Sequence, residues 1–144
     1  MKVFLTGADG FIGSHLAEHL VRSGHEVKAL AIYNSQGSWG WLDTLPADIK
    51  DSLEVVLGDI RDPYHMNQLA AGQDAIMHLA ALIAIPFSYV APDMYVQTNV
   101  QGTLNLLNAA RTHNVGRFIH TSTSEVYGTA QYVPMDEGHM LQGQ

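Results

Sequence analysis

The chain has 144 residues, of which 47% are hydrophobic and 15% are charged, and this composition predicts one globular domain with a substantial core. Its formal net charge of −7 argues against a nucleic-acid-binding protein, which needs a basic face to neutralise phosphates. The chain has no cysteine, no apolar run long enough to span a bilayer and no signal peptide, so we expect a cytoplasmic protein without disulfides, thiolate metal sites or a membrane partner.

The first predicted unit is a strand, a glycine-rich loop and a helix. Residues 2–5 are apolar enough for a buried parallel strand, and residues 11–22 carry apolar side chains at helical spacing. Between them, Gly7 permits a tight turn, Gly10 lets the backbone approach a pyrophosphate, and Gly13 lets the helix pack on the strand. The spacing G-x-x-G-x-x-G differs from the usual G-x-G-x-x-G, and a purely structural turn is the alternative. The strand before and the helix after it favour a dinucleotide-binding loop, because the helix N-terminus offers free N–H groups to the phosphates.

The rest of the chain alternates predicted strands with predicted helices. Further strands are expected at residues 26–32, 53–57, 75–79 and 117–121. Helices are expected at residues 63–70, after a capping Asp62, and at residues 92–110, the longest of the chain. The segment 33–48 reads as irregular, with a short packed helix near Trp41. This order predicts an α/β fold, a Rossmann-type doubly wound parallel sheet with helices on both faces, over residues 1–144.

In such a fold, ligands bind outside the carboxyl ends of the strands, so the residues that follow each strand are candidate site residues. Five motifs occur there in order: T-G-x-x-G-x-I-G, G-D-I-R-D, H-L-A-A, T-N-V-x-G-T and S-T-S-E-V-Y-G. Over the whole chain, this set resembles the extended short-chain dehydrogenase/reductase family, which includes the sugar-nucleotide epimerases and dehydratases.

The resemblance implies NAD or NADP as a cofactor that is tightly bound and internally recycled. The glycine loop would hold the pyrophosphate, the loop after the third strand would flank the adenine, and the end of the fourth strand would line the ribose and nicotinamide. The implied cofactor-binding residues are Gly7, Gly10, Phe11, Ile12, Gly13, Asp59, Ile60, Leu79, Ala80, Ala81, Asn99 and Thr121. On sequence alone, Asp59 is alternatively a turn carboxylate at a strand end.

The resemblance assigns catalysis to Thr123, Ser124 and Glu125. Thr123 matches a residue that hydrogen-bonds the sugar 4-hydroxyl, Glu125 matches the glutamate that takes the C5 proton, and Ser124 stands where many dehydratases have an acid. The alternative for Glu125 is a solvated loop carboxylate. The Y-x-x-x-K pair of the family does not occur in these 144 residues. We therefore expect the N-terminal part of a longer enzyme, without its last strands and its substrate lobe.

The implied reaction is a sugar-nucleotide 4,6-dehydration, with oxidation at C4, loss of water across C5–C6 and return of the hydride to C6. Residues 31–43 look most like dehydratases of the legionaminic-acid type, which act on UDP-N-acetylglucosamine-like nucleotide sugars. A UDP-glucuronate decarboxylase or a sugar-nucleotide epimerase is the alternative within the family. A dinucleotide-binding fragment without catalytic activity is the alternative of another class. A homodimer is expected for the full-length enzyme.

The choice between NAD and NADP stays open in the sequence. NAD-dependent members of the family end the second strand with an aspartate that binds the ribose, and this chain has Ala31 there. Asn34, Ser35 or Ser38 could bind either a ribose hydroxyl or a 2′-phosphate.

We do not expect the histidines of this chain to form a metal site. The H-x-x-E-H sequence at residues 15–19 lies on the helix after the glycine loop, so we predict that no metal binds there. His78 and His120 fall inside predicted strands and are expected to be packed core histidines.

Overall fold

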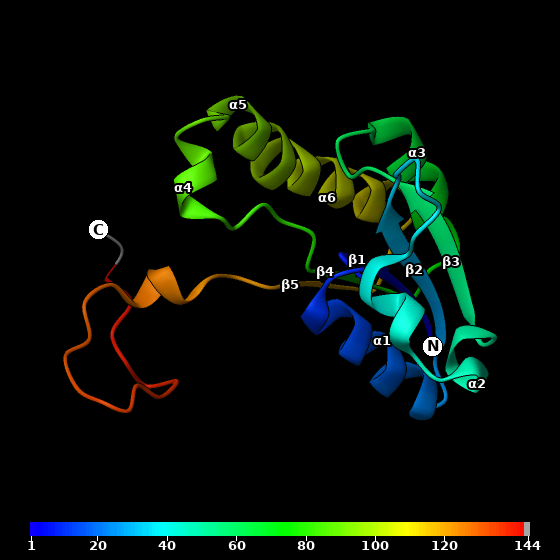
Figure 1. Ribbon diagram of the computed structural model, residues 1–144, viewed down its shortest axis with the longest axis horizontal. Coiled ribbons are helices and arrows are strands. Elements are labelled where there is room, and N and C mark those ends of the chain that lie inside the picture. The colour runs from blue at the N-terminus through cyan, green and yellow to red at the C-terminus, as the bar shows by residue number, and fades with distance from the viewer. Residues whose placement is uncertain (143–144) are drawn as a thin grey trace.

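The computed structural model describes residues 1–142, and its strands form one parallel five-stranded sheet in the order β3-β2-β1-β4-β5 (Figure 1). The strands are β1 (Lys2–Thr6), β2 (Glu26–Ile32), β3 (Leu53–Gly58), β4 (Ala75–His78) and β5 (Arg117–His120). Each predicted strand is present, with limits that differ by at most one residue. The predicted Rossmann-type parallel sheet is therefore confirmed.

Alternate side chains of β1 pack on opposite faces of the sheet and create two apolar cores. Val3 and Leu5 belong to a core shared with α1 (Phe11–Arg22), whereas Phe4 belongs to a core shared with α3 (Pro63–Ala70) and α6 (Thr103–Thr112). Figure 1 shows α3 and α6 above the sheet and α1 below it. Because both faces are covered, the central strand is buried from Val3 to Thr6, as its apolar run predicts, and only its first residue, Lys2, is exposed.

The helices α1 and α3 begin and end where the sequence predicts. Asp62 caps α3, since its Oδ1 accepts hydrogen bonds from the backbone N–H groups of Tyr64 (3.0 Å) and His65 (3.1 Å). The short helix expected near Trp41 is the 3₁₀ helix η1 (Gly40–Thr44). Three further one-turn helices were not predicted: α2 (Ala47–Lys50), α4 (Ile85–Ser88) and the 3₁₀ helix η3 (Ser124–Tyr127).

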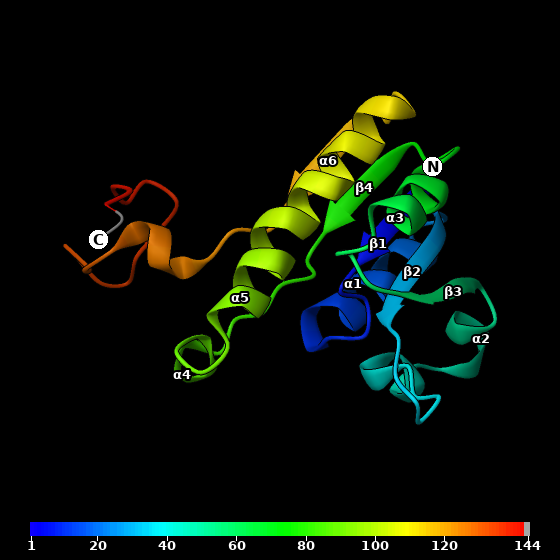
Figure 2. The ribbon, with the colours of Figure 1, turned by 90° about the horizontal axis from the view of Figure 1, so that it is seen from above.

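The long predicted helix is one continuous rod whose middle is a π-helix (Figure 2). It runs from α5 (Pro92–Tyr95) through the π-helical segment η2 (Val96–Gly102) into α6, and ends two residues beyond the predicted limit of 110. At Gly102, a Cβ would lie 2.5 Å from the side chain of Ile60. The absence of a side chain there lets the rod pack against the loop that follows β3.

The strand β5 lies at an edge of the sheet and pairs only with β4. Phe118 packs partly against the second core, but Ile119 and His120 are exposed, so the expectation of a buried His120 is wrong. His78, in β4 between β1 and β5, is buried as predicted. Residues 121–142 project away from the sheet (Figures 1 and 2). Within residues 1–142, no helix combines the length and the apolar character that a membrane crossing requires.

The cap at Asp62 gives a test of how α3 is fixed next to the loop after β3. Asp62→Ala removes the acceptor of two backbone N–H groups, and we expect it to lower the free energy of unfolding by about 1 kcal/mol. Asp48→Ala is the matched control, because Asp48 is an exposed aspartate in α2 whose helix has no side-chain cap. Urea denaturation of both variants measures the difference, and equal losses would contradict the capping role.

Candidate functional site

The carboxyl ends of the strands bring the predicted site loops to one edge of the sheet. In the parallel register, Thr6 of β1 pairs with His78 of β4, and His78 pairs with His120 of β5. On the other side of β1, Ile32 of β2 pairs with Gly58 of β3. The glycine loop and the loops after β2, β3 and β4 therefore start at neighbouring points, which is the ligand-binding edge of a doubly wound sheet.

The glycine loop fits tightly against the end of β4. Gly7 has φ +70°, and a Cβ there would lie 2.7 Å from the backbone nitrogen of Ala80. A Cβ on Gly13 would overlap the carbonyl oxygen of Gly7. Gly10 differs, because it is exposed and a Cβ would meet only the Gly7 oxygen, at 3.4 Å. Gly7 and Gly13 thus close the turn, and Gly10 keeps the space in front of it open.

The N-terminus of α1 opens onto this space. No side chain caps the helix, and its first turn has no acidic residue. Its first N–H groups have no partner within the helix, and the helix dipole places partial positive charge there. The side chains of Phe11 and Ile12 are 59% and 66% exposed, so neither is packed into the core. This combination suits an anionic ligand.

A chain of hydrogen bonds joins β1, β4 and the long helix beneath the loop. The hydroxyl of Thr103 donates to the carbonyl of Asn99 (2.7 Å), so its oxygen accepts from His78 Nε2 (2.9 Å). The other ring nitrogen, Nδ1, then accepts from the hydroxyl of Thr6 (2.8 Å), whose oxygen accepts from the N–H of Ala80 (3.3 Å). This assignment makes His78 a neutral imidazole with its proton on Nε2.

The electrostatics of His78 agree with the hydrogen bonds. Burial, and to a lesser extent the neighbouring His120, lowers the pKa of His78 to about 4. The ring is therefore neutral near pH 7. A charged ring would have to donate from both nitrogens, and the donating hydroxyl of Thr6 would then have to turn away.

Two asparagines of the long helix hold the loops after β3 and β4. Asn99, in the π-helical segment, accepts from the N–H of Leu82 (2.8 Å) and donates to its carbonyl (2.9 Å). Asn105 is buried and donates to the carbonyls of Ile60 (3.0 Å) and Arg61 (3.1 Å). Asn99, which the family resemblance places among the cofactor-binding residues, thus uses its side-chain amide to hold the backbone of the loop that follows Leu79, Ala80 and Ala81.

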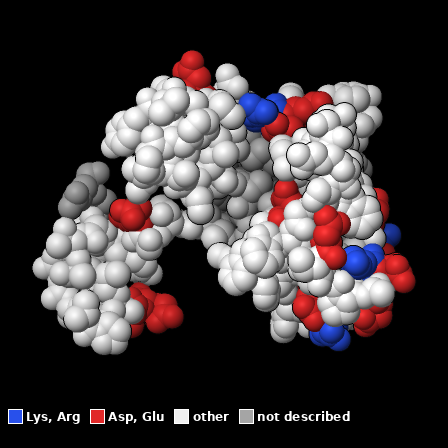
Figure 3. All heavy atoms as spheres, viewed as in Figure 1, with Lys and Arg blue, Asp and Glu red and all other residues white. Residues whose placement is uncertain are grey.

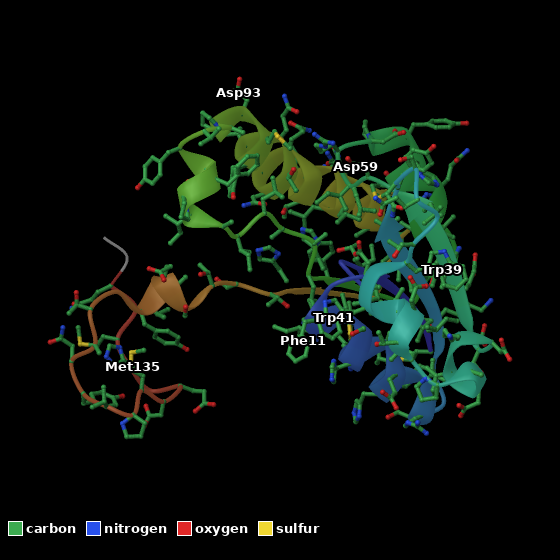
Figure 4. The ribbon with its side chains drawn as sticks, viewed as in Figure 1. Phe11, Trp39, Trp41, Asp59, Asp93 and Met135 are labelled. Carbon is green, nitrogen blue, oxygen red and sulfur yellow. The ribbon has the colours of Figure 1, made fainter. Side chains whose placement is uncertain are left out.

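The loop after β3 is closed by an ion pair. Both carboxylate oxygens of Asp59 accept from Nε of Arg61, at 3.0 and 2.9 Å. The side-chain hydrogen bond from Arg61 lowers the pKa of Asp59, with a smaller opposing effect of burial. Ile60 is only 4% exposed and packs into the core, so its side chain positions the loop. Figure 4 shows Asp59 on the α6 side of the sheet, away from Phe11.

The end of β2 is held by the glycine loop. Ala31 is buried, and the backbone N–H of Ile32 donates to Oδ2 of Asp9 (3.1 Å). Asn34 uses its side-chain amide within its own loop, donating to the carbonyls of Ile32 and Ser38 and accepting from two backbone N–H groups. The hydroxyl of Ser38 donates to Asp43 (2.9 Å). Two of the three side chains considered for the ribose therefore build this loop instead.

The 3₁₀ helix η1 packs against the start of α1. The rings of Phe11 and Trp41 are in an edge-to-face contact with centroids 5.4 Å apart, and Figure 4 shows them together at this end of the helix. The ring of His15 contacts Phe11 from the next turn (4.7 Å), and its Nδ1 donates to the Phe11 carbonyl (2.9 Å). In the same H-x-x-E-H sequence, Glu18 pairs with Arg22 at 2.8 Å.

The residues assigned to catalysis lie in the projecting segment. Thr123, Ser124 and Glu125 are all exposed, and the Thr123 hydroxyl accepts from the N–H of Glu125 (3.3 Å), capping η3. Thr121 is exposed as well, and its N–H donates to the His78 carbonyl (3.1 Å). Figure 3 shows this segment as a separate lobe from the α/β body. The structure brings Thr121 to the edge of the sheet but does not bring Glu125 to the glycine loop.

The charged side chains on the face seen in Figure 3 are mixed, and basic groups lie beside acidic ones without forming a basic patch. Sequence reasoning missed Asp9, Thr6, Thr103 and Asn105. The signal available for three of them was a polar side chain within an apolar strand or on the apolar face of a helix. Such a side chain needs a partner when it is buried.

Comparisons with known proteins show which proteins this chain is similar to. The family model described as GDP-mannose 4,6 dehydratase matches residues 4–144. A dTDP-glucose 4,6-dehydratase of Streptomyces antibioticus is 38% identical over 92% of this chain and 40% of its own length. A UDP-glucose 4-epimerase of Streptomyces lividans is 36% identical over 94% of this chain and 40% of its own. The dTDP-glucose 4,6-dehydratase DesIV of Streptomyces venezuelae, solved with NAD and DAU bound, superposes with a TM-score of 0.81 and 34% identity over 99% of this chain and 46% of its own. The chain thus spans less than half the length of these three proteins.

The buried neutral His78 predicts how stability depends on pH. Its pKa is about 4 in the folded protein and near 6.5 when exposed, so between these values the unfolded chain binds more protons. Stability should therefore fall as the pH falls from 6.5 towards 4, with a contribution from His78 of about 3 kcal/mol. Urea denaturation across this range measures it.

His78→Gln cannot titrate, and its unfolding free energy should change less across the same pH range than that of the wild type. His19→Gln, at an exposed position of α1, is the matched control for the substitution itself. Parallel pH profiles for the wild type and His78→Gln would contradict the neutral buried state.

Proposed function

Because the chain belongs to the GDP-mannose 4,6-dehydratase family, we propose that it is the NAD(P)-binding part of a sugar-nucleotide 4,6-dehydratase. The observation that carries the proposal is the open space at Gly10 in front of the uncapped N-terminus of α1. The solved Streptomyces venezuelae dehydratase, which is 34% identical, has NAD bound and supports the same assignment.

The residues around the glycine loop fit a dinucleotide. A pyrophosphate needs backbone N–H donors and close approach, and the loop provides both, since a side chain at Gly10 would fill the space that the structure leaves open. Backbone N–H groups of residues 11–13, the first turn of α1, would hold the pyrophosphate. Asp59 and Ile60 would flank the adenine, and residues 79–81 would line the nicotinamide side. His78 would set the position of this last segment through Thr6 and Ala80.

A bound nicotinamide supplies the hydride acceptor and donor that a 4,6-dehydratase requires. The residues of this chain would orient the sugar and move protons. The hydroxyl of Thr123 would hold the sugar 4-hydroxyl, and Glu125 would take the proton from C5, which oxidation at C4 makes acidic. Ser124 has a hydroxyl where many dehydratases have an acid, so a different residue would assist the loss of water from C6. The proposed substrate is a UDP-N-acetylglucosamine-like nucleotide sugar.

An epimerase is the second candidate, because the Streptomyces lividans UDP-glucose 4-epimerase is 36% identical to this chain. Inversion at C4 needs no base at C5 and loses no water. Glu125 therefore favours the dehydratase, and the product of the reaction separates the two activities.

The direct experiment is to incubate the full-length protein with UDP-N-acetylglucosamine and to identify the product by mass spectrometry and NMR. We expect a 4-keto-6-deoxy sugar nucleotide that is lighter by one water. A product of unchanged mass with inverted C4 would identify an epimerase, and unreacted substrate would contradict the proposed substrate.

Glu125→Gln tests the proposed base. It should reduce the rate of elimination at least about 100-fold, the usual size of a general-base contribution, and leave cofactor binding unchanged. Glu137→Gln is the matched control, since Glu137 is an exposed glutamate of the same segment. Elimination at the wild-type rate in Glu125→Gln would show that Glu125 is not the base.

Gly10→Ala tests the cofactor site separately from the chemistry. The backbone at Gly10 is extended, with φ −81°, so alanine should cost about 1 kcal/mol of stability or less, mostly as a poorer helix cap. The added methyl should weaken NAD binding at least about tenfold, because it fills the space needed by the pyrophosphate.

Gly13→Ala is the contrasting variant. Its Cβ would overlap the Gly7 carbonyl, so we expect it to lower the unfolding free energy by about 1–3 kcal/mol. Urea denaturation and NAD titration compare the two variants, and wild-type NAD affinity in Gly10→Ala would contradict the proposed position of the pyrophosphate.

A further inference from the structure

Asp9, the residue before Gly10 in the glycine loop, contacts the end of β2. Its Oδ2 accepts from the N–H of Ile32 (3.1 Å), and its backbone carbonyl accepts from the N–H of Trp41 (2.9 Å). Gly40, with φ +61°, leaves room for this contact, since a Cβ there would lie 2.6 Å from the Asp9 carbonyl oxygen. Two neighbouring segments therefore fix Asp9, and its carboxylate is held at the last residue of β2.

The end of β2 is where a doubly wound fold holds the adenosine ribose of a dinucleotide, usually through an acidic residue of that strand. Here the strand offers a buried Ala31, followed by the exposed Ile32. The polar groups of Asn34 and Ser38 are engaged inside their own loop. The carboxylate that reaches the end of β2 comes instead from the loop after β1.

We propose that Asp9 replaces the missing acid of β2 and selects NAD over NADP. One carboxylate oxygen is anchored by the N–H of Ile32, and the other, which has no hydrogen bond within residues 1–142, binds the ribose 2′-hydroxyl. This inference rests on the proposed binding of NAD(P) and deepens it. Asp9 acts on the choice of cofactor and has no part in the reaction at the sugar.

The charges around Asp9 point the same way. A 2′-phosphate adds about two negative charges and needs an arginine or lysine nearby. On the neighbouring strand end, the guanidinium of Arg61 is engaged with Asp59. Behind the loop, the ammonium of Lys50 donates to the carbonyl of Asp43, whose carboxylate adds a second negative charge. A phosphate at this edge would meet carboxylates and no unengaged cation among the described residues.

A competing explanation is that Asp9 only ties the glycine loop to β2. Asp9→Asn separates the two, because the asparagine oxygen still accepts from the N–H of Ile32 while the charge is lost. If Asp9 is only a tie, the variant keeps the wild-type preference between cofactors. If Asp9 selects NAD, the preference collapses.

The test titrates the full-length protein, freed of nucleotide, with NADH and with NADPH, and follows nicotinamide fluorescence. We expect the wild type to bind NADH at least about tenfold more tightly than NADPH, because like charges repel the 2′-phosphate. Asp9→Asn should reduce this ratio at least about tenfold, mainly by tightening NADPH binding. Asp9→Ser, which also removes the charge, should shift the ratio in the same direction and serves if the asparagine variant does not fold.

Asp48→Asn is the matched control, because it removes the same charge from an exposed position of α2 and should keep the wild-type ratio. Equal wild-type affinity for NADH and NADPH, or an unchanged ratio in folded Asp9→Asn and Asp9→Ser, would overturn the role of Asp9 while leaving the proposed function intact. Binding of neither nucleotide would overturn both.

Discussion

The chain must turn from β1 into α1 within residues 7–10, and the backbone of Ala80 lies directly against this turn. The turn is possible because Gly7 adopts φ +70° and because neither Gly7 nor Gly13 has a side chain. Once it is made, the N-terminus of α1 faces the carboxyl edge of the sheet. The Thr6 hydroxyl oxygen then accepts a hydrogen bond from the N–H of Ala80, and Thr6 links the turn to His78 and the long helix. The geometry of the candidate cofactor site depends on this one close approach.

Local sequence patterns predicted the strands and the two helices α1 and α3 because apolar spacing, a glycine loop and the Asp62 cap act over a few residues. They did not predict the π-helical segment, since its side chains keep a spacing that also fits an ordinary helix. His120 was expected in the core because it falls inside a predicted strand, but β5 is an edge strand of the described sheet and His120 is exposed there. The links from Thr6 to Thr103 and from Asp9 to Ile32 join segments far apart in the chain, and no local pattern contains them.

The structure separates two tasks. The α/β body carries the glycine loop and the uncapped N-terminus of α1, where we propose that the cofactor binds, and both are held by backbone geometry and by neutral hydrogen bonds. The side chains assigned to proton transfer are exposed on the projecting segment that follows β5. The residues proposed to hold the cofactor therefore lie together in the body, apart from those assigned to the chemistry of the sugar. Asp9 lies within the body, so a substitution there changes cofactor preference without touching the residues assigned to catalysis.

Amide hydrogen exchange of the full-length protein, with and without NAD, reports directly on the backbone groups that are proposed to hold the cofactor. We expect slower exchange at residues 8–13 and 80–82 when NAD is added, with no change in α2. Unchanged exchange at residues 8–13 under saturating NAD would contradict the assignment of the glycine loop as the dinucleotide site.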